Sequence, residues 1–567
     1  MKILFLTSAH NSLSQRLLIE LTKCGHAVAV ALATSDEAMT AAAAQHAPDL
    51  IIAPMLKVAI PKTICSRYKC LIVHPGIKGD RGPASLDWAI ARGEESWGVT
   101  VLEAAAEFDA GPIWAAHEFS IKGQSLTKSS LYRHQVTEAA IRGVLEAVAK
   151  FESGEFQPEP LDYRKPDVRG CLRSPMRQGD RAIDWTSDST KIIARKIRAA
   201  DSAPGVLDTL FGKPYFLYGA HEEDRIKGVP GEILAQRHGA ICRGTIDGAL
   251  WITHLKAKDH GPFAGIKLPA MQVLGEFFHT PTAMLSMGAP TDFRTFREIR
   301  YAEKDQVGYL HFEFYNGAMS TEQCYRLRNA FLAARARPTK VIVLFGGRDF
   351  WSNGIHLNVI EVAPDPAMES WRNINAIDDL IYEILNTMSH LVIAGLRGNA
   401  GAGGAMLALA ADQVYARKGV VLNPHYRSMG GLYGSEYHTY TMPRRVGRAK
   451  AMDLTERCLP LGTQAAKAMG FLDDAFGESV EEFEETLVLR AEEIAHHGNF
   501  WRLLREKHER RLAGECIKPL AVYRAVELKK MWANFFGPDP AYHEARQKFV
   551  YKGAPVPQVA APMRRQA

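Results

Sequence analysis

A glycine-rich loop followed by a run of small apolar residues constrains this chain more than any other stretch. Residues 397–412 read Arg-Gly-Asn-Ala-Gly-Ala-Gly-Gly-Ala-Met-Leu-Ala-Leu-Ala-Ala-Asp, with four glycines before the apolar run. The glycines strip side chains from the loop, and the apolar run indicates a buried helix that begins directly after it. The first turn of a helix has unpaired N–H groups that can hold an oxyanion. The sequence therefore predicts an oxyanion-binding site at this loop.

Length and composition indicate a soluble protein of several domains. At 567 residues the chain exceeds what one hydrophobic core supports, and ~100–200 residues per domain predict about three or four domains. Hydrophobic residues make up 47% and charged residues 23%, which is ordinary for globular proteins and argues against a fibre or a disordered chain. The net charge of +6 is spread along the sequence, so it predicts no nucleic-acid partner.

Cysteine usage and hydropathy predict a cytoplasmic location. The eight cysteines lie far apart, and none forms a CxxC or Cys/His pair with zinc spacing, so we expect reduced thiols and no metal. The first ten residues become polar too early for a signal peptide. No apolar run approaches the roughly 20 residues needed to span a bilayer, so no membrane partner is expected.

The N-terminal part alternates strands with helices. Short apolar runs at Lys2–Thr7, Val28–Leu32 and Leu50–Ala53 indicate strands, and helical patterns lie between them at Gln15–Lys23 and Ser35–His46. This alternation predicts a parallel α/β sheet. The first turn lacks GxGxxG, which argues against a dinucleotide cofactor there.

The first candidate chemistry in this part is a histidine and an aspartate that each follow a strand. His74 ends an apolar run before a Gly/Pro loop, and Asp109 lies in a Gly-flanked turn after a later run. Because open α/β sheets bind ligands at the carboxyl ends of their strands, the two side chains can form one acid/base pair. The alternative is that His74 is an ordinary loop histidine and Asp109 a turn-forming residue.

The order of these motifs resembles a known family. His74-Pro, the Gly-rich loop, Gly98-Val-Thr and Asp109-Ala-Gly-Pro follow one another as in the catalytic domain of 10-formyltetrahydrofolate-dependent formyltransferases, over residues 1–165. The resemblance implies 10-formyltetrahydrofolate as one-carbon donor and catalytic roles for His74 and Asp109. It places Ile72 in the folate site, where the family has an asparagine that helps to polarise the formyl oxygen. Formyl transfer is then altered, or the missing donor comes from elsewhere.

The next segment predicts a small β-barrel. Residues 166–184 are rich in Arg and Pro, a helical pattern follows at Ser189–Ala200, and short alternating runs come after it. The segment resembles the C-terminal accessory domain of transformylases that act on charged tRNA, whose barrel is OB-like. Since no dense basic stripe with interleaved aromatic residues is present, we expect a structural or interdomain role here and no nucleic acid.

The opening glycine loop belongs to a third segment with its own resemblance. A strand at 340–347 ends in Gly-Gly, a turn at 349–357 follows, and the glycine loop comes about forty residues later. Together with Leu461-Gly-Thr through Asp473, this resembles the crotonase (enoyl-CoA hydratase/isomerase) fold over residues 293–515. The resemblance implies an oxyanion hole made by the backbone amides of Asn353 and Gly403. It implies that coenzyme A contacts the loop through Gly398, Gly403 and Gly404. The alternative is a plain glycine-rich turn.

The residues that hydratases of this family use for acid/base chemistry are missing. One of the two glutamates corresponds to Met406, whose thioether cannot move protons, and the other falls near His425. The following loop instead carries Tyr426 and Glu436, which we predict to be the catalytic pair. The alternatives are a carboxylate that satisfies a helix dipole and a tyrosine that only packs.

The combination of the two halves resembles the HypX/HoxX family of nickel–iron hydrogenase maturation factors. The resemblance implies transfer of a formyl group from 10-formyltetrahydrofolate to coenzyme A and decarbonylation of formyl-coenzyme A to carbon monoxide. It also implies hydrogenase maturation proteins as partners. The alternatives are an amine formyltransferase fused to an acyl-thioester hydrolase, and a non-catalytic folate-binding scaffold. We predict four domains, at 1–165, 166–286, 287–515 and, as a helical extension with a tail, 516–567.

Overall fold

The computed structural model describes most of the chain as two compact units. The described residues are 1–123, 126–259, 261, 263–275, 280–496 and 498–552, so part of the predicted C-terminal tail, from 553 on, lies outside them. The first unit comprises Met1–Leu255, Pro269–Met284 and Pro290–Phe296, and the second comprises Lys256–Leu268, Leu285–Ala289 and Arg297–Ala567. The finer boundaries of four domains stay a prediction.

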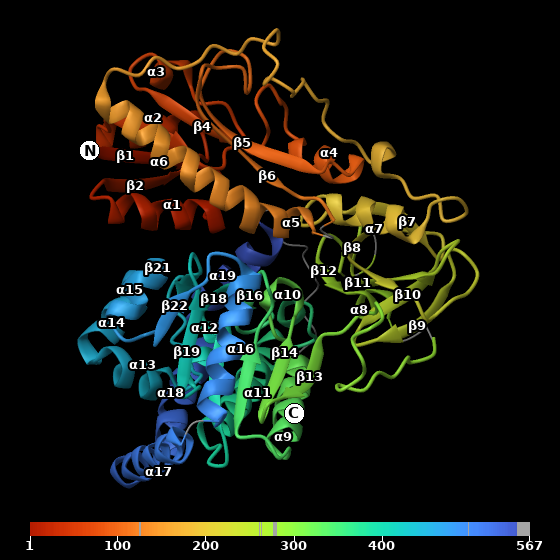
Figure 1. The fold of residues 1–567 in the computed structure, drawn as a ribbon, viewed down its shortest axis with the longest axis vertical. Coiled ribbons are helices and arrows are strands. Elements are labelled where there is room, and N and C mark those ends of the chain that lie inside the picture. Colours follow the sequence, from red (N-terminus) through yellow and green to blue (C-terminus); the bar gives the residue numbers. More distant parts are fainter. Residues whose placement is uncertain (124–125, 260, 262, 276–279, 497, 553–567) are drawn as a thin grey trace. The chain divides into compact units, whose positions relative to one another are not determined.

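The first unit begins with a six-stranded sheet in the order β2-β1-β3-β4-β5-β6 (Figure 1). Its strands are β1 (Lys2–Thr7), β2 (Ala27–Leu32), β3 (Leu50–Ala53), β4 (Cys70–His74), β5 (Ser96–Glu103) and β6 (Ile113–Ser120). The helices α1 (Ser12–Lys23) and α6 (Thr137–Ser153) contribute buried side chains to one core, and α2 (Asp36–His46) contributes to a second. This is the mixed α/β architecture expected from alternating strands and helices.

The prediction of a parallel sheet is correct for four strands and wrong for two. Strands β1 to β4 pair in parallel, whereas β4 pairs antiparallel with β5, and β5 antiparallel with β6. No helix lies between β5 and β6, so the chain turns back directly beside the strand it has left. The end of β5 lies beside the start of β4, with Glu103 opposite Leu71, and the loop after β5 brings Asp109 to within 3.4 Å of His74 at the end of β4.

The first unit continues with strands in the order β7-β8-β11-β10-β9, in which β7 pairs antiparallel with β8, and β10 pairs antiparallel with β9 and β11. The strands are β7 (Val206–Leu210), β8 (Lys213–Glu223), β9 (Ile233–Arg237), β10 (Ala240–Gly244) and β11 (Ala249–Ala257), preceded by helix α7 (Thr190–Ala199). Within the described part of the chain no pairing joins β7 to β9. Closure into an OB-like barrel therefore stays a prediction.

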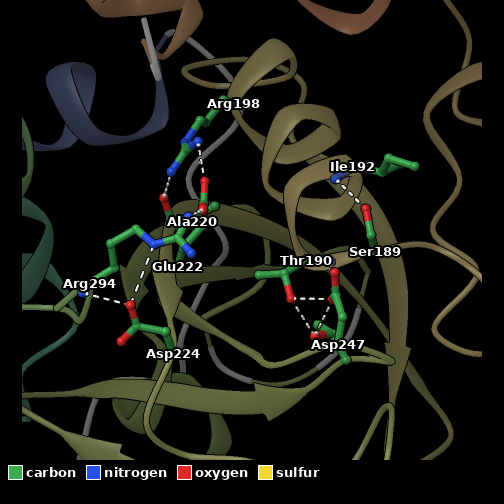
Figure 2. A network of polar contacts seen from close by, with 10 residues as sticks. Ser189, Thr190, Ile192, Arg198, Ala220, Glu222, Asp224, Asp247 and Arg294 are labelled. Carbon is green, nitrogen blue, oxygen red and sulfur yellow. Dashed lines mark hydrogen bonds and ion pairs between the residues drawn. The ribbon is translucent and has the colours of Figure 1, made fainter. Parts of the chain in front are cut away.

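Polar contacts fasten α7 and its neighbours to these strands (Figure 2). The backbone N–H and the hydroxyl of Thr190 both donate to Oδ1 of Asp247, at 2.8 and 2.7 Å. Nη1 of Arg198 donates to Oε1 of Glu222 at 3.1 Å, and Arg294 pairs with the other oxygen of the same carboxylate. The arginines of this network are neutralised by carboxylates, in keeping with the structural role expected for this segment.

The second unit contains two sheets. The larger has the order β13-β14-β15-β17-β19-β22 and the smaller β16-β18-β20-β21. The strands are β13 (Ile299–Lys304), β14 (Val307–Phe312), β15 (Val341–Phe345), β16 (Phe350–Ser352), β17 (Leu391–Leu396), β18 (Asn399–Gly401), β19 (Gln413–Arg417), β20 (Val421–Asn423), β21 (Leu461–Gly462) and β22 (Asp474–Phe476). All residues of β15 and β17 are buried, as expected for parallel strands covered on both faces.

The second unit also contains a set of helices. They are α9 (Thr321–Arg335), α10 (Leu357–Glu361), α11 (Pro366–Leu385), α12 (Gly403–Leu409), α13 (His438–Val446), α14 (Arg448–Arg457), α15 (Thr463–Ala468), α16 (Val480–His496), α17 (Asn499–Ile517), α18 (Leu520–Phe536) and α19 (Ala541–Tyr551). Helix α12 is the predicted helix after the glycine loop, and all seven of its residues are buried. The predicted C-terminal helical region divides into α18 and α19 because Gly537-Pro538-Asp539-Pro540 interrupts it.

Two further expectations concern the whole chain. All eight cysteines are free thiols, as predicted. Among the described residues, no helix combines the length and apolarity that a bilayer crossing requires.

Candidate active sites

The first candidate site lies at the end of β4 in the first unit. His74 is the last residue of that strand and is 5% exposed. Its Nδ1 lies 3.4 Å from Oδ1 of Asp109, so the predicted pair does meet. Asp109 adopts a left-handed backbone with φ 55°, and its Oδ2 accepts the N–H of Gly82 at 3.1 Å. The geometry suits an acid/base pair, while the catalytic roles of both residues stay predictions.

A second carboxylate contacts the same histidine, and sequence reasoning missed it. Oδ2 of Asp80 lies 3.1 Å from Nε2 of His74, and Oδ1 of Asp80 accepts Nε of Arg173 at 2.5 Å. Burial favours the neutral acid, but hydrogen bonds from His74, Ser85 and Arg173 outweigh it and hold the pKa of Asp80 below its usual range. Asp80 therefore stays ionised beside His74.

Gly76 makes room for this contact. A Cβ at that position would lie 2.5 Å from Nε2 of His74 and 2.6 Å from Oδ2 of Asp80. Ile72, predicted to lie in the folate site, sits two residues before His74 in β4, opposite Leu102 of β5, and is half-buried. Its role in binding stays a prediction.

The second candidate site is in the second unit, where the two predicted loops converge. Strand β16 pairs in parallel with β18, and a Cβ on Gly354 would lie 3.1 Å from the backbone nitrogen of Gly403. The two loops are in close contact, as an oxyanion hole built from both of them requires.

The two predicted oxyanion donors differ in their availability. The backbone N–H of Asn353 donates to the carbonyl oxygen of Gly317 at 2.7 Å. The turn before Gly317, with Asn316 at φ 57° and Gly317 at φ 71°, directs that carbonyl toward the loop. Gly403 is the first residue of α12, where helix N–H groups lack partners within the helix. A ligand oxygen would thus find Gly403 as the more accessible donor.

The other glycines of the loop have a packing reason. A Cβ on Gly404 would lie 2.0 Å from the carbonyl oxygen of Ser352, and one on Gly398 would lie 2.6 Å from that of Arg348. These positions require glycine so that two backbones can approach each other. The predicted contacts of Gly398 and Gly404 with coenzyme A stay predictions.

Tyr426 and Glu436 form a buried pair beside this loop, as the sequence suggested they could. The Tyr426 hydroxyl donates to Oε2 of Glu436 at 2.8 Å, and the N–H of Ser435 donates to the same oxygen at 2.9 Å. Tyr426 is 6% and Glu436 1% exposed. The other carboxyl oxygen, Oε1, faces Gly403, since a Cβ there would lie 2.1 Å from it. One oxygen of Glu436 is thus anchored and the other is presented to the glycine loop.

The backbone at this pair is unusual. Glu436 and Tyr437 both have left-handed conformations, with φ 59° and 54°. Non-glycine residues adopt this conformation rarely, and consecutive cases at a buried site are held by surrounding contacts. A Cβ on Gly434 would lie 2.2 Å from the Tyr426 ring, so only glycine lets the loop close over the tyrosine.

Two further buried carboxyls surround Glu436, and sequence reasoning missed both. Asp378 of α11 accepts the N–H of Glu436 and the hydroxyl of Ser435, each at 2.8 Å. Glu527 of α18 accepts the N–H of Thr439 at 2.8 Å, and its Oε2 lies 3.4 Å from the Ser435 hydroxyl. We call Asp378, Glu436 and Glu527 the carboxyl cluster.

Burial and mutual repulsion raise the pKa values of this cluster. Burial and then the charge of Asp378 raise the pKa of Glu436 to about 8. Burial and then Glu527 raise the pKa of Asp378 to about 7, and burial raises the pKa of Glu527 to about 7. Burial also raises the pKa of Tyr426 well above its usual value, so the tyrosine keeps its proton. Glu436 is therefore poised to exchange a proton near neutral pH.

The close approach of Glu436 to the loop yields a prediction. Gly403→Ala should lower the free energy of unfolding of the second unit by about 1–3 kcal/mol, because the new methyl group overlaps Oε1 of Glu436. Chemical denaturation checks this. Gly288→Ala, where a Cβ meets nothing within 4 Å, is the matched control. Combined with Glu436→Ala, Gly403→Ala should cost less than it does alone, and strict additivity would argue against the contact.

Comparison with protein families supports the division into two types of chemistry. The family described as "Formyl transferase" matches residues 31–148, and "Formyl transferase, C-terminal domain" matches 175–265. "Enoyl-CoA hydratase/isomerase" matches residues 309–555. The first candidate site falls mostly within the formyltransferase match and the second within the hydratase/isomerase match.

Known proteins match either nearly the whole chain or a part of it. The hydrogenase maturation factor HoxX of Bradyrhizobium diazoefficiens is 47% identical over 565 residues, which are 99% of this chain and 96% of the relative. A crystal structure of HypX from Aquifex aeolicus in complex with tetrahydrofolic acid matches with a TM-score of 0.93 and 47% identity. The match covers 98% of this chain and 96% of the HypX chain. The methionyl-tRNA formyltransferase of Thermotoga neapolitana is 28% identical over 213 residues, 37% of this chain and 66% of the relative.

Proposed function

Because the chain belongs to the HypX/HoxX family of hydrogenase maturation factors, we propose that it synthesises carbon monoxide for nickel–iron hydrogenase assembly. The formyl group of 10-formyltetrahydrofolate passes to the thiol of coenzyme A, and formyl-coenzyme A is then decarbonylated. The observation that carries this proposal is the buried Tyr426–Glu436 pair facing Gly403, in a site where Met406 replaces a hydratase glutamate. In this reaction folate and coenzyme A are substrates.

In the first step the carbon–nitrogen bond to N10 of the folate breaks and a carbon–sulfur bond to coenzyme A forms. The thiol proton ends on N10, so the step neither oxidises nor reduces the formyl carbon. His74 with Asp109 supplies the acid/base function for this proton transfer. The folate complex of the Aquifex aeolicus relative supports folate binding by this chain.

In the second step the carbon–sulfur bond of the formyl thioester breaks. The formyl carbon loses its proton, the sulfur gains one, and carbon monoxide and free coenzyme A result. We assign proton removal to Oε1 of Glu436, because Oε2 is occupied by Tyr426 and Ser435. With its pKa raised to about 8, Glu436 is a stronger base than an ordinary carboxylate and can return the proton to the departing sulfur.

The remaining residues of the second site hold the thioester and its base. The N–H of Gly403 is the donor for the formyl oxygen, where it would stabilise the charge that develops as the bond breaks. Tyr426 keeps its proton and directs it at Glu436, so we assign it the role of orienting donor. Met406 is fully buried and has no group to position a water, which fits loss of the hydration chemistry.

The test is to incubate the purified protein with 10-formyltetrahydrofolate and coenzyme A and to follow carbon monoxide by the absorbance of haemoglobin. We expect carbon monoxide and tetrahydrofolate in equal amounts, and no carbon monoxide when coenzyme A is left out. Formate should be a minor product. Formate in place of carbon monoxide would instead identify a thioester hydrolase, and no tetrahydrofolate release would identify a binding scaffold.

A further inference from the structure

His74 is held between two carboxylates that lie in different environments. On one side, the side chain of Asp80 is 0% exposed and contacts Nε2 at 3.1 Å. On the other side, the side chain of Asp109 is 17% exposed and lies 3.4 Å from Nδ1. A ligand can therefore reach the ring from the Asp109 side, whereas the Asp80 side is closed.

Arg173 fixes the closed side. Its Nε donates to Oδ1 of Asp80 at 2.5 Å, and its side chain is 7% exposed. The guanidinium carbon lies 5.2 Å from the centre of the Trp97 ring, whose own N–H donates to the carbonyl of Pro75 at 3.0 Å. A buried carboxylate held by a buried arginine has little freedom to leave the histidine.

The backbone around Asp80 is fixed as well. The N–H of Arg173 donates to the carbonyl of Arg81 at 2.9 Å, and the N–H of Arg81 donates to Cys171 at 3.2 Å. A Cβ on Gly170 would lie 1.9 Å from the nitrogen of Asp80, so the segment carrying Arg173 packs directly on the Asp80 loop. The Arg- and Pro-rich stretch at 166–184 is thus part of the candidate site and more than a linker.

Asp109 has a looser hold on the ring. It is connected to the Asp80 loop by one hydrogen bond, from the N–H of Gly82 at 3.1 Å. Its distance to the ring is longer than that of Asp80, and its side chain is partly open to solvent. The carboxylate beside the open side of the ring is the one that an incoming substrate can meet.

We propose that Asp80, held by Arg173, orients His74 through Nε2, and that Nδ1, on the Asp109 side, is the nitrogen that exchanges protons during formyl transfer. Asp80 and Arg173 are positioning residues, and Asp109 faces the substrate. This inference rests on the proposed formyl transfer. It adds Asp80 to the predicted pair of His74 and Asp109 as the residue that orients the ring, and it gives the Arg173 segment a part in the chemistry.

The test compares Asp80→Asn, Asp109→Asn, Arg173→Met and Arg173→Lys in the full chain. Arg169→Met is the matched control, because Arg169 is in the same segment and pairs with Glu118 at the surface, where both side chains are about half exposed. Tetrahydrofolate release gives kcat and KM over a range of pH. Nitrogen-15 spectra of the histidine rings, with the His74 signals assigned by their loss in His74→Gln, report on each ring nitrogen without any reaction.

We expect Asp80→Asn to lower kcat on the order of 10²-fold, to alter its pH profile and to leave the KM for folate within about threefold. It should shift the Nε2 signal of His74, and Asp109→Asn should shift mainly the Nδ1 signal. Arg173→Met should change the same signals as Asp80→Asn in the same direction, Arg173→Lys should restore most of the wild-type behaviour, and the control should change neither readout.

Unchanged His74 signals and kcat in a folded Asp80→Asn protein would overturn the proposal. If that variant does not fold, the comparison of Arg173→Met with Arg173→Lys decides by the same criteria. Wild-type protein that releases no tetrahydrofolate would refute the proposed formyl transfer, while the ring spectra still test the orientation of His74. The two failures are therefore distinguishable.

Discussion

Glu436→Gln is expected to reduce carbon monoxide release by about 10²–10⁴-fold, the size of the contribution that a positioned base makes. The amide has the same shape as the carboxyl and can still accept from Tyr426 and Ser435, but it cannot take up the formyl proton. Formyl transfer depends on His74 and Asp109, so it should continue. Formyl-coenzyme A should accumulate, and mass spectrometry of quenched reactions can measure it.

Two tyrosine variants complete this experiment, one to test the role of Tyr426 and one as its control. Tyr426→Phe removes the hydroxyl that holds Oε2 of Glu436 and should cost less than Glu436→Gln if Tyr426 only orients the base. An equal loss would instead make Tyr426 the acid. Tyr433→Phe, in the same loop, is the matched control and should leave the rate unchanged. A wild-type rate in Glu436→Gln would remove Glu436 from the mechanism.

Apolar periodicity was sufficient to predict most of the fold. The runs at Lys2–Thr7 and Leu50–Ala53 are strands with those bounds, and the glycine loop does lead into a buried helix. Apolar periodicity could not predict that β5 and β6 pair antiparallel. Strand direction depends on the path of the connecting segment and not on the residues of the strand. Sheet closure after β7 is likewise a property of pairing between distant segments.

The candidate sites were predicted where a recognisable motif carried their residues. Tyr426 and Glu436 lie ten positions apart on one glycine-rich loop, and their pairing followed from that loop. Arg173 reaches Asp80 from 93 positions away, and Asp378 reaches Glu436 from 58, so no local pattern connects them. Glu527 did leave a signal, since helical spacing places it on the same face as the buried Leu520 and Met531. A carboxyl on an apolar helical face indicates a buried polar partner.

The carboxyl cluster should make the second unit less stable locally as the pH rises. Glu436 has a folded pKa of about 8, against 4.5 when exposed, and Asp378 and Glu527 each have about 7. Folded protein therefore keeps protons that unfolded protein releases, so stability is fully present below about pH 4 and is lost as the pH passes 7 to 8. At about 1.4 kcal/mol per unit, the loss by pH 9 is on the order of several kcal/mol.

Hydrogen exchange measures this loss locally, which is necessary because a chain with two units does not unfold in one step. Peptides covering 426–440 and α18 should lose protection between pH 6 and 9, after correction for the intrinsic exchange rate. Peptides of β1 to β4 should keep their protection over the same pH range. In the Asp378→Asn variant the asparagine is uncharged at all of these pH values, so the loss of protection should be smaller.

The same substitution connects stability to catalysis. Removing the charge of Asp378 leaves Glu436 with less repulsion, so the pKa of Glu436 should fall and the pH at which carbon monoxide release reaches its maximum should fall with it. A merely structural Asp378 would change protection without moving the pH profile. If protection from hydrogen exchange in the wild type did not change from pH 6 to 9, the three carboxyls would not have raised pKa values in the folded protein. Together the two measurements separate the stabilising role of the cluster from its control of the catalytic base.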